Sequence, residues 1–159
     1  MKLLIWPLIL VAAWLGFSRL MFTESRVMPL ITAHTLKVYD GDDSACDFYA
    51  DDVLVDVVQD ARLGRWEVEG GKDEICAFLR KAAAVFSLAE AHVDTEFSDV
   101  VLQRQGFPWT EATLSYTEHT TVRGGRLPEM VFTSRDELVL KRTLTGVKVK
   151  AIRSRGEQH

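Results

Sequence analysis

Residues 50–86 constrain the fold of this chain more than any other stretch. They run from an apolar segment at 53–58, through a tryptophan-bearing edge at 65–68, to Gly70-Gly71 and then into a segment with helical periodicity. Residues 53–58 are apolar on both faces except at Asp56, which is typical of an inner β-strand. A strand followed by a glycine pair and an amphipathic helix predicts a sheet with a helix packed across it.

The segment after the glycine pair has a helical start and one apolar face. Lys72-Asp73-Glu74 places acidic side chains in the first turn, where they complement the helix dipole. Apolar residues then recur at helical spacing, at Ile75, Leu79, Ala82 and Phe86, with Phe78, Val85 and Ala89 beside them. This stripe predicts a helix that covers the inner strand.

Two further helices are expected before this stretch. Met28-Pro29 opens the first, because proline is tolerated in a first turn, and Asp40-Gly41 ends it. Asp42 or Asp43 can cap a second, short helix that holds Ala45, Cys46, Phe48 and Tyr49.

Beyond Glu90 the pattern changes from helical to alternating, which predicts strands for the rest of the chain. The parity of the apolar positions switches near Asp99, as at a β-bulge. Strands are expected at 92–102, 109–123, 130–141 and 147–152, with a glycine hairpin at 124–125. The order predicts an α+β fold in which a strongly curved, mainly antiparallel sheet wraps around three helices.

The chain of 159 residues suits one domain, and its composition is acidic. Its formal charge is −4, which argues against a nucleic-acid partner. Cys46 and Cys76 fall on apolar faces of separate expected helices, so two buried thiols are favoured over a disulfide. No spacing of ligand residues indicates a metal ion, and no motif indicates a cofactor.

Residues 3–17 carry no charge and include Trp6 and Trp14. A membrane anchor over 1–22, with Arg19 near its end, is favoured, which would make the protein single-pass with its domain outside the cytoplasm. Gly16-Phe17-Ser18 keeps a cleaved signal peptide and a secreted domain open. We expect a linker at 23–27, one domain at 28–153 and a polar tail at 154–159.

Three short motifs carry a resemblance to a known superfamily. They are Asp40-Gly41-Asp42, Phe48 through Val53, and Glu69 through Ile75. With them, the chain resembles the nuclear-transport-factor-2-like (NTF2-like) superfamily, which includes ketosteroid isomerases and SnoaL-type cyclases. The resemblance implies a cone-shaped pocket between the first helices and the concave face of the sheet. These motifs are helix stops, caps and turn glycines, so they specify the fold better than the activity.

Inward polar residues are therefore the candidates for a site. Glu118 shares strand parity with Leu114 and Tyr116, and burial there would raise its pKa. The alternative, a glutamate near the strand end that reaches solvent, is favoured. Asp136 shares parity with Phe132, but a bend at 134–137 that turns it outward is favoured. Phe132, Leu114 and Asp136 are the candidate ligand contacts.

Asp56 and His34 complete the candidate set. A buried Asp56 needs a pocket or a partner such as Arg65 or His34. In the resemblance, the general-base aspartate of ketosteroid isomerases corresponds to Val57, and their oxyanion-stabilising tyrosine corresponds to about His34. The catalytic candidates are thus Asp56, Glu118, Tyr116 and His34, whereas His92 and His119 have outward parity.

Two functions are compatible with these features. The first and favoured one is a membrane-tethered binding or assembly module, as in anchored secretion components of this fold. It would dimerise through its convex sheet face or dock an envelope protein, since Trp109 lies on the polar parity of its strand. The second is a pocket enzyme or carrier that acts on a small apolar molecule by acid–base chemistry.

Overall fold

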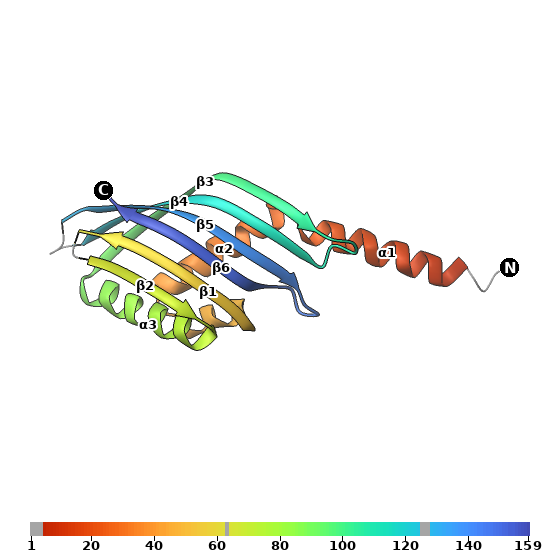
Figure 1. The fold of residues 1–159 in the computed structure, drawn as a ribbon, viewed down its shortest axis with the longest axis horizontal. Helices are drawn as coiled ribbons and strands as arrows, with labels where there is room; N and C mark the ends of the chain where they lie inside the picture. The colour runs from red at the N-terminus through yellow and green to blue at the C-terminus, as the bar shows by residue number, and fades with distance from the viewer. Residues whose placement is uncertain (1–4, 63, 125–127) are drawn as a thin grey trace.

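The computed structural model describes residues 5–62, 64–124 and 128–159 (Figure 1). Its helices are α1 (Ile5–Met21), α2 (Glu24–Tyr39), the 3₁₀-helix η2 (Asp43–Phe48) and α3 (Lys72–Leu88). Its strands are β1 (Tyr49–Ala61), β2 (Gly64–Gly70), β3 (Ala91–Gln105), β4 (Glu111–Gly124), β5 (Met130–Arg142) and β6 (Val147–Gln158). The predicted hairpin at 124–125 lies partly outside the described residues.

The strands form one curved sheet in the order β2-β1-β6-β5-β4-β3. All neighbours are antiparallel except β1 and β6, which are parallel. Figure 1 shows α2 and α3 against one side of the sheet, while α1 extends away from its end. The predicted α+β fold, with helices packed in a curved and mainly antiparallel sheet, is confirmed.

Local sequence explains where the helices begin. The Asp42 side chain accepts a hydrogen bond from the Ser44 backbone N–H at 2.8 Å and caps η2. The Glu74 carboxylate accepts one from the Gly71 N–H at 2.9 Å at the start of α3. Asp99 has a positive φ of 52° where the β3–β4 register shifts, which confirms the predicted bulge.

The core lies between the concave face and the helices. Leu114 and Leu140 are fully buried on the sheet, and Ile31 of α2 and Ile75 of α3 pack on that layer. Cross-strand neighbours Leu102, Leu114 and Leu138 continue one apolar row over three strands. The helices pack against this apolar row.

Two predicted boundaries are wrong. Residues 154–159 are not a polar tail, because β6 continues to Gln158 between β1 and β5, and residues 154–157 have strand partners on both sides. The expected linker 23–27 is the start of α2, with Thr23 at the N-cap. Phe22 and Val27, at 0% and 1% exposed, anchor this junction in the core.

A disulfide joins Cys46 of η2 to Cys76 of α3, with the Cα atoms 5.8 Å apart. The favoured prediction of two buried thiols is therefore wrong. The apolar faces of η2 and α3 pack against each other. This packing brings the two cysteines close enough to form a disulfide.

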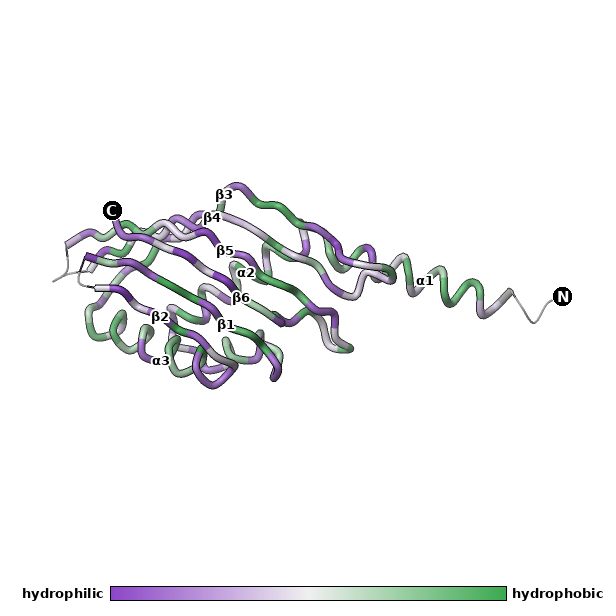
Figure 2. The backbone as a smooth tube through the Cα atoms, viewed as in Figure 1, coloured by the Kyte–Doolittle hydropathy of each residue, from purple (hydrophilic) through white to green (hydrophobic). Residues whose placement is uncertain are grey.

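Many residues of the N-terminal helix α1 are hydrophobic (Figure 2). Trp6, Leu8 and Leu10 are 72%, 67% and 66% exposed. Among the described residues, no single helix has the length and apolarity needed to cross a membrane. The segments Trp6–Met21 and Glu24–Tyr39 meet that test only as a pair with a 52° bend.

Candidate functional site

Polar side chains gather on the concave face of the central strands. Tyr116 on β4 pairs with Asp136 on β5, which pairs with Ser154 on β6. Glu118 lies two residues along β4 from Tyr116 and pairs with Ser134. Alternate residues of a strand share a face. Five polar side chains of three strands therefore belong to one surface, next to the apolar core.

Glu118 stands partly buried in this surface. The Thr120 hydroxyl donates a hydrogen bond to Glu118 Oε1 at 3.0 Å, and Phe97 is the β3 neighbour of Glu118. Burial, followed by the charge of Asp136, raises the pKa of Glu118 to about 7, and the Thr120 hydrogen bond partly opposes this. The favoured prediction that Glu118 reaches solvent at a strand end is wrong, because α2 and its Tyr39 cover this part of the concave face.

Asp136 is more deeply buried, at 7% exposed. The Ser134 hydroxyl donates to Asp136 Oδ2 at 2.7 Å, and Ser154 supplies a second hydrogen bond. Burial still raises the pKa of Asp136. The favoured prediction that a bend turns Asp136 outward is wrong, since β5 keeps a continuous register with β4 through residues 134–137.

Three tyrosines surround the two carboxyl groups. Tyr49 and Tyr116 are 3% and 8% exposed, and Tyr39 at the end of α2 is partly buried. Burial, and then the charges of Asp136 and Glu118, raise the pKa of the Tyr49 and Tyr116 hydroxyls. Burial followed by Glu118 raises the pKa of Tyr39. The three hydroxyls stay protonated and can donate hydrogen bonds.

A hydrogen-bonded chain connects α2 to Glu118. Tyr39 is hydrogen-bonded to Thr95 and Thr120, and the two threonine hydroxyls lie 3.4 Å apart. Thr120 also contacts Glu118. The carboxyl group is thus held from the helix side as well as from the sheet.

His34 of α2 lies beside this cluster. Its ring is 4.7 Å from that of Phe48 and meets Tyr49 edge-on at 5.3 Å. Burial, with a contribution from Lys37, lowers the pKa of His34 to about 4, against a hydrogen bond to the Ala45 backbone. His34 is therefore neutral at pH 7, and its Nε2 is buried without a hydrogen-bond partner in the described structure. A bound molecule could satisfy this nitrogen.

Asp56 does not belong to the site, contrary to the sequence-based prediction. Arg155 Nη2 lies 2.6 Å from Asp56 Oδ2, and Arg153 Nε lies 3.8 Å away. The hydrogen bond from Arg155 lowers the pKa of Asp56. The expected partners do not contact it, since Arg65 pairs with Glu67 at 2.5 Å. The parallel pairing of β1 with β6, which the sequence did not indicate, puts the two arginines beside Asp56.

The remaining candidates divide between core and rim. Leu114 was predicted to contact a ligand. It is fully buried in the core, so it is not accessible to one. Phe132 is partly buried and pairs with Thr120, two residues along β4 from Glu118. His92 and His119 are exposed, as their parity predicted.

Sequence reasoning missed five residues of the cluster: Tyr39, Tyr49, Thr120, Ser134 and Ser154. Strand parity could have found Thr120 and Ser134, because both share the parity of Glu118 and Asp136. Ser154 was assigned to the tail. The two tyrosines carried no periodic signal, since they lie at helix ends.

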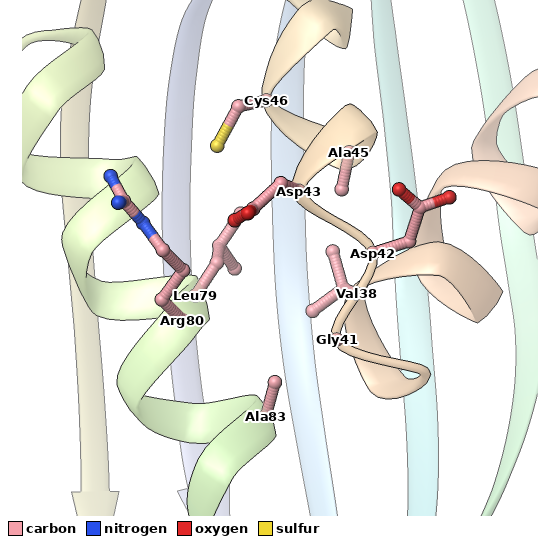
Figure 3. Close-up of a pocket in the computed structure, with 9 residues that line it drawn as sticks. All are labelled: Val38, Gly41, Asp42, Asp43, Ala45, Cys46, Leu79, Arg80 and Ala83. Atoms are coloured by element: carbon pink, nitrogen blue, oxygen red, sulfur yellow. The ribbon is translucent and has the colours of Figure 1, made fainter.

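Two cavities lie elsewhere in the domain. The first, of about 20 Å³, lies between η2 and α3 and holds no more than one water (Figure 3). The second, of about 480 Å³, is an open hollow at the strand ends, lined by residues such as Asp52, Lys141 and Lys148. Glu118 and Asp136 line neither of them. In the described part of the chain, no group of three or more His, Cys, Asp or Glu residues could hold a metal ion.

Comparison with solved structures places this fold in a recognised class. A candidate scytalone dehydratase from Novosphingobium aromaticivorans has a TM-score of 0.64 at 11% identity, over 82% of this chain and 80% of that one. The β subunit of benzoate 1,2-dioxygenase from Burkholderia mallei has a TM-score of 0.68 at 8% identity, over 87% and 91%. An NTF2-like protein of unknown function from Pseudomonas putida has a TM-score of 0.58 at 16% identity, over 82% and 84%.

The chain therefore adopts the NTF2-like α+β fold, as its turn and cap motifs suggested. No protein-family model matches the sequence, and no curated protein matches it. At these identities the likeness concerns the fold and not the chemistry.

Proposed function

We propose that the domain binds a small, largely apolar molecule on its concave face and transfers protons to or from it. The observation that carries this is the Glu118–Asp136 pair. The charge of the buried Asp136 acts on Glu118 beside three tyrosines, and no basic side chain of the described residues contributes to the pKa of either carboxyl group. A carboxyl group with a pKa near 7 can give and accept protons at neutral pH.

The cluster divides into roles that suit proton abstraction next to a carbonyl group. Glu118, as the carboxylate, would take the proton from carbon. Tyr116 and Tyr49 would donate hydrogen bonds to the carbonyl oxygen as negative charge develops on it. Burial, and then the charge of Asp136, which Ser134 and Ser154 hold, keep the pKa of Glu118 high. Glu118 can then give this proton to a different carbon atom of the molecule, which completes an isomerisation, or to a hydroxyl group that leaves as water.

A probe with an apolar ring and one ionisable hydroxyl group tests this directly. We expect 2-naphthol, an enolate mimic, to bind the full chain, and Glu118→Gln and Tyr116→Phe to weaken its binding at least tenfold. Asp56→Asn is the matched control, because it neutralises a carboxylate on the opposite face. Equal binding by all four proteins, or no binding by the unmodified chain, would remove the proposal.

The second part of the proposal concerns α1, which we propose tethers the domain to a membrane outside the cytoplasm. Its apolar side chains are exposed, and Phe17 and Leu20 near its end are still 53% and 55% exposed. Such a surface is stable against lipid or another apolar partner. The disulfide supports an oxidising compartment.

Alkaline extraction of membranes tests the tether. We expect the full chain to stay in the membrane pellet and to keep residues 1–22 by intact mass. A soluble chain that lacks these residues would identify them as a cleaved signal peptide.

A further inference from the structure

The end of the domain from which α1 departs carries two exposed apolar turns. Phe107, between β3 and β4, is 73% exposed, and Leu144, between β5 and β6, is fully exposed. The Phe107 ring lies 5.5 Å from that of Trp109. The Arg142 N–H donates to the Thr110 carbonyl at 2.8 Å, which holds the two turns together. Figure 1 shows α1 leaving the sheet at this end.

Contacts with the body of the domain set the direction of α1. The Arg142 guanidinium lies 4.9 Å from the centre of the Trp14 ring, halfway along α1. Arg104 Nε donates to the Phe22 carbonyl at 2.9 Å, just beyond its last residue. The two turns therefore lie alongside the C-terminal half of α1.

Four arginines cluster around this half of the helix. Arg19 belongs to its last turn, Arg26 contacts Met21 Sδ at 3.8 Å, and Arg104 and Arg142 make the contacts described above. The chain as a whole has a charge of −4, so this basic group is a local feature. Arginine and aromatic residues next to an apolar segment are typical of the headgroup region of a bilayer.

From this arrangement we propose that the turns at Phe107 and Leu144 and the four arginines dock the domain onto an anionic lipid bilayer. The inference rests on the tether proposed above and adds to it an orientation of the domain. The apolar turn residues enter the lipid surface, and the arginines contact the phosphate groups. Glu118 lies seven residues along β4 from Glu111, about 23 Å at strand spacing, so the concave site stays in water.

Hydrogen–deuterium exchange of the full chain on vesicles tests the docking. The probes are vesicles of phosphatidylcholine alone and vesicles with phosphatidylglycerol at roughly one part in three. We expect α1 to be protected on both, and residues 106–110 and 142–146 to gain protection only on the anionic vesicles.

The double variant Phe107→Ser, Leu144→Ser should lose this added protection and should bind the anionic vesicles about tenfold more weakly. Leu88→Ser is the control, because Leu88 is 87% exposed but ends α3 at the opposite end of the sheet. Thermal melts of all three proteins should coincide, since each changed side chain is exposed.

Two outcomes separate the docking from the tether. Unchanged exchange at both turns, with α1 protected, would overturn the docking and leave the tether in place. Absence of protection along α1 on either vesicle would overturn both.

Discussion

At Glu118, burial and the charge of Asp136 favour the protonated carboxyl group, so this residue makes folding depend on pH. Its pKa is about 7 in the folded protein against an ordinary value of 4.5. Between these values the folded chain binds more protons than the unfolded chain, so the free energy of unfolding falls as pH rises. The fall ends above the folded pKa. Its full size is on the order of 3 kcal/mol.

Glu118→Gln should remove this dependence. We expect the variant to be more stable than the unmodified chain by on the order of 2 kcal/mol near pH 8 and nearly equal to it near pH 4.5. The amide oxygen can still accept the Thr120 hydrogen bond, so packing is kept. Urea unfolding at the two pH values measures the difference. Glu96→Gln, an exposed change on β3, is the control, and equal pH profiles for all three proteins would contradict the assignment.

Strand alternation was sufficient to nominate Glu118, Tyr116 and Asp136, because parity alone decides which face a strand residue occupies. It could not decide whether these side chains were covered, since the cover comes from α2 and Tyr39, far away in sequence. The prediction that Asp56 belongs to the site was wrong for a related reason. Its arginine partners lie on β6, which pairs with β1 only through the parallel crossover at the centre of the sheet.

At the scale of elements, the disulfide ties the short helix η2 to α3 across 30 residues of chain. By the chain-entropy account, closing such a loop stabilises the folded state by about 3–4 kcal/mol. We expect a reductant to lower the melting temperature of the unmodified chain and to leave that of Cys46→Ala, Cys76→Ala unchanged. Equal melts of the unmodified chain with and without reductant would show that the bond adds little.

The junction of α1 and α2 decides where the folded unit begins. Caps and apolar stripes predicted the helices, but charge and polarity alone suggested a membrane segment that ends at Phe22 and a linker that holds Val27, both of which the structure places in the core. Polarity also misled the prediction for the end of β6, which was expected to be a tail although its polar residues pair with both neighbouring strands. Composition predicts exposure poorly where backbone pairing or one buried ring decides the structure.

A chain that starts at Leu20 should therefore fold without α1, whereas one that starts at Thr23 should be less stable by about 3 kcal/mol, because it lacks the buried Phe22 ring. Circular dichroism melts of the two shortened chains measure this. Phe22→Ala in the longer of them should reproduce the loss. If both shortened chains melt together, Phe22 does not anchor the domain.

At the scale of the whole molecule, the convex face of the sheet has two unlike halves. The β6–β1–β2 half carries ion pairs, such as Arg155 with Asp56 and Arg65 with Glu67. The β4 and β5 half carries partly buried hydroxyl residues, among them Thr113, Ser115 and Thr133, together with the exposed Arg135 and Glu137 of β5. Partly buried hydroxyl residues cost less to desolvate than ion pairs do, so the β4 and β5 half is better suited to a second copy of the chain.

We therefore expect the domain to form a homodimer through the convex side of β4 and β5. A two-fold interface brings equivalent residues together, so Thr113→Arg, whose cross-strand neighbours Val139 and Gln103 carry no charge, should place like charges face to face and produce monomers. Trp109→Ala should leave the dimer intact, because Trp109 lies in the turn after Phe107 and precedes β4, not on its polar face as the sequence suggested. Sedimentation velocity on the chain that starts at Leu20 distinguishes these results. A monomeric unmodified chain at high concentration would reject the dimer, and a dimer lost on Trp109→Ala alone would move the interface to the turns at the α1 end.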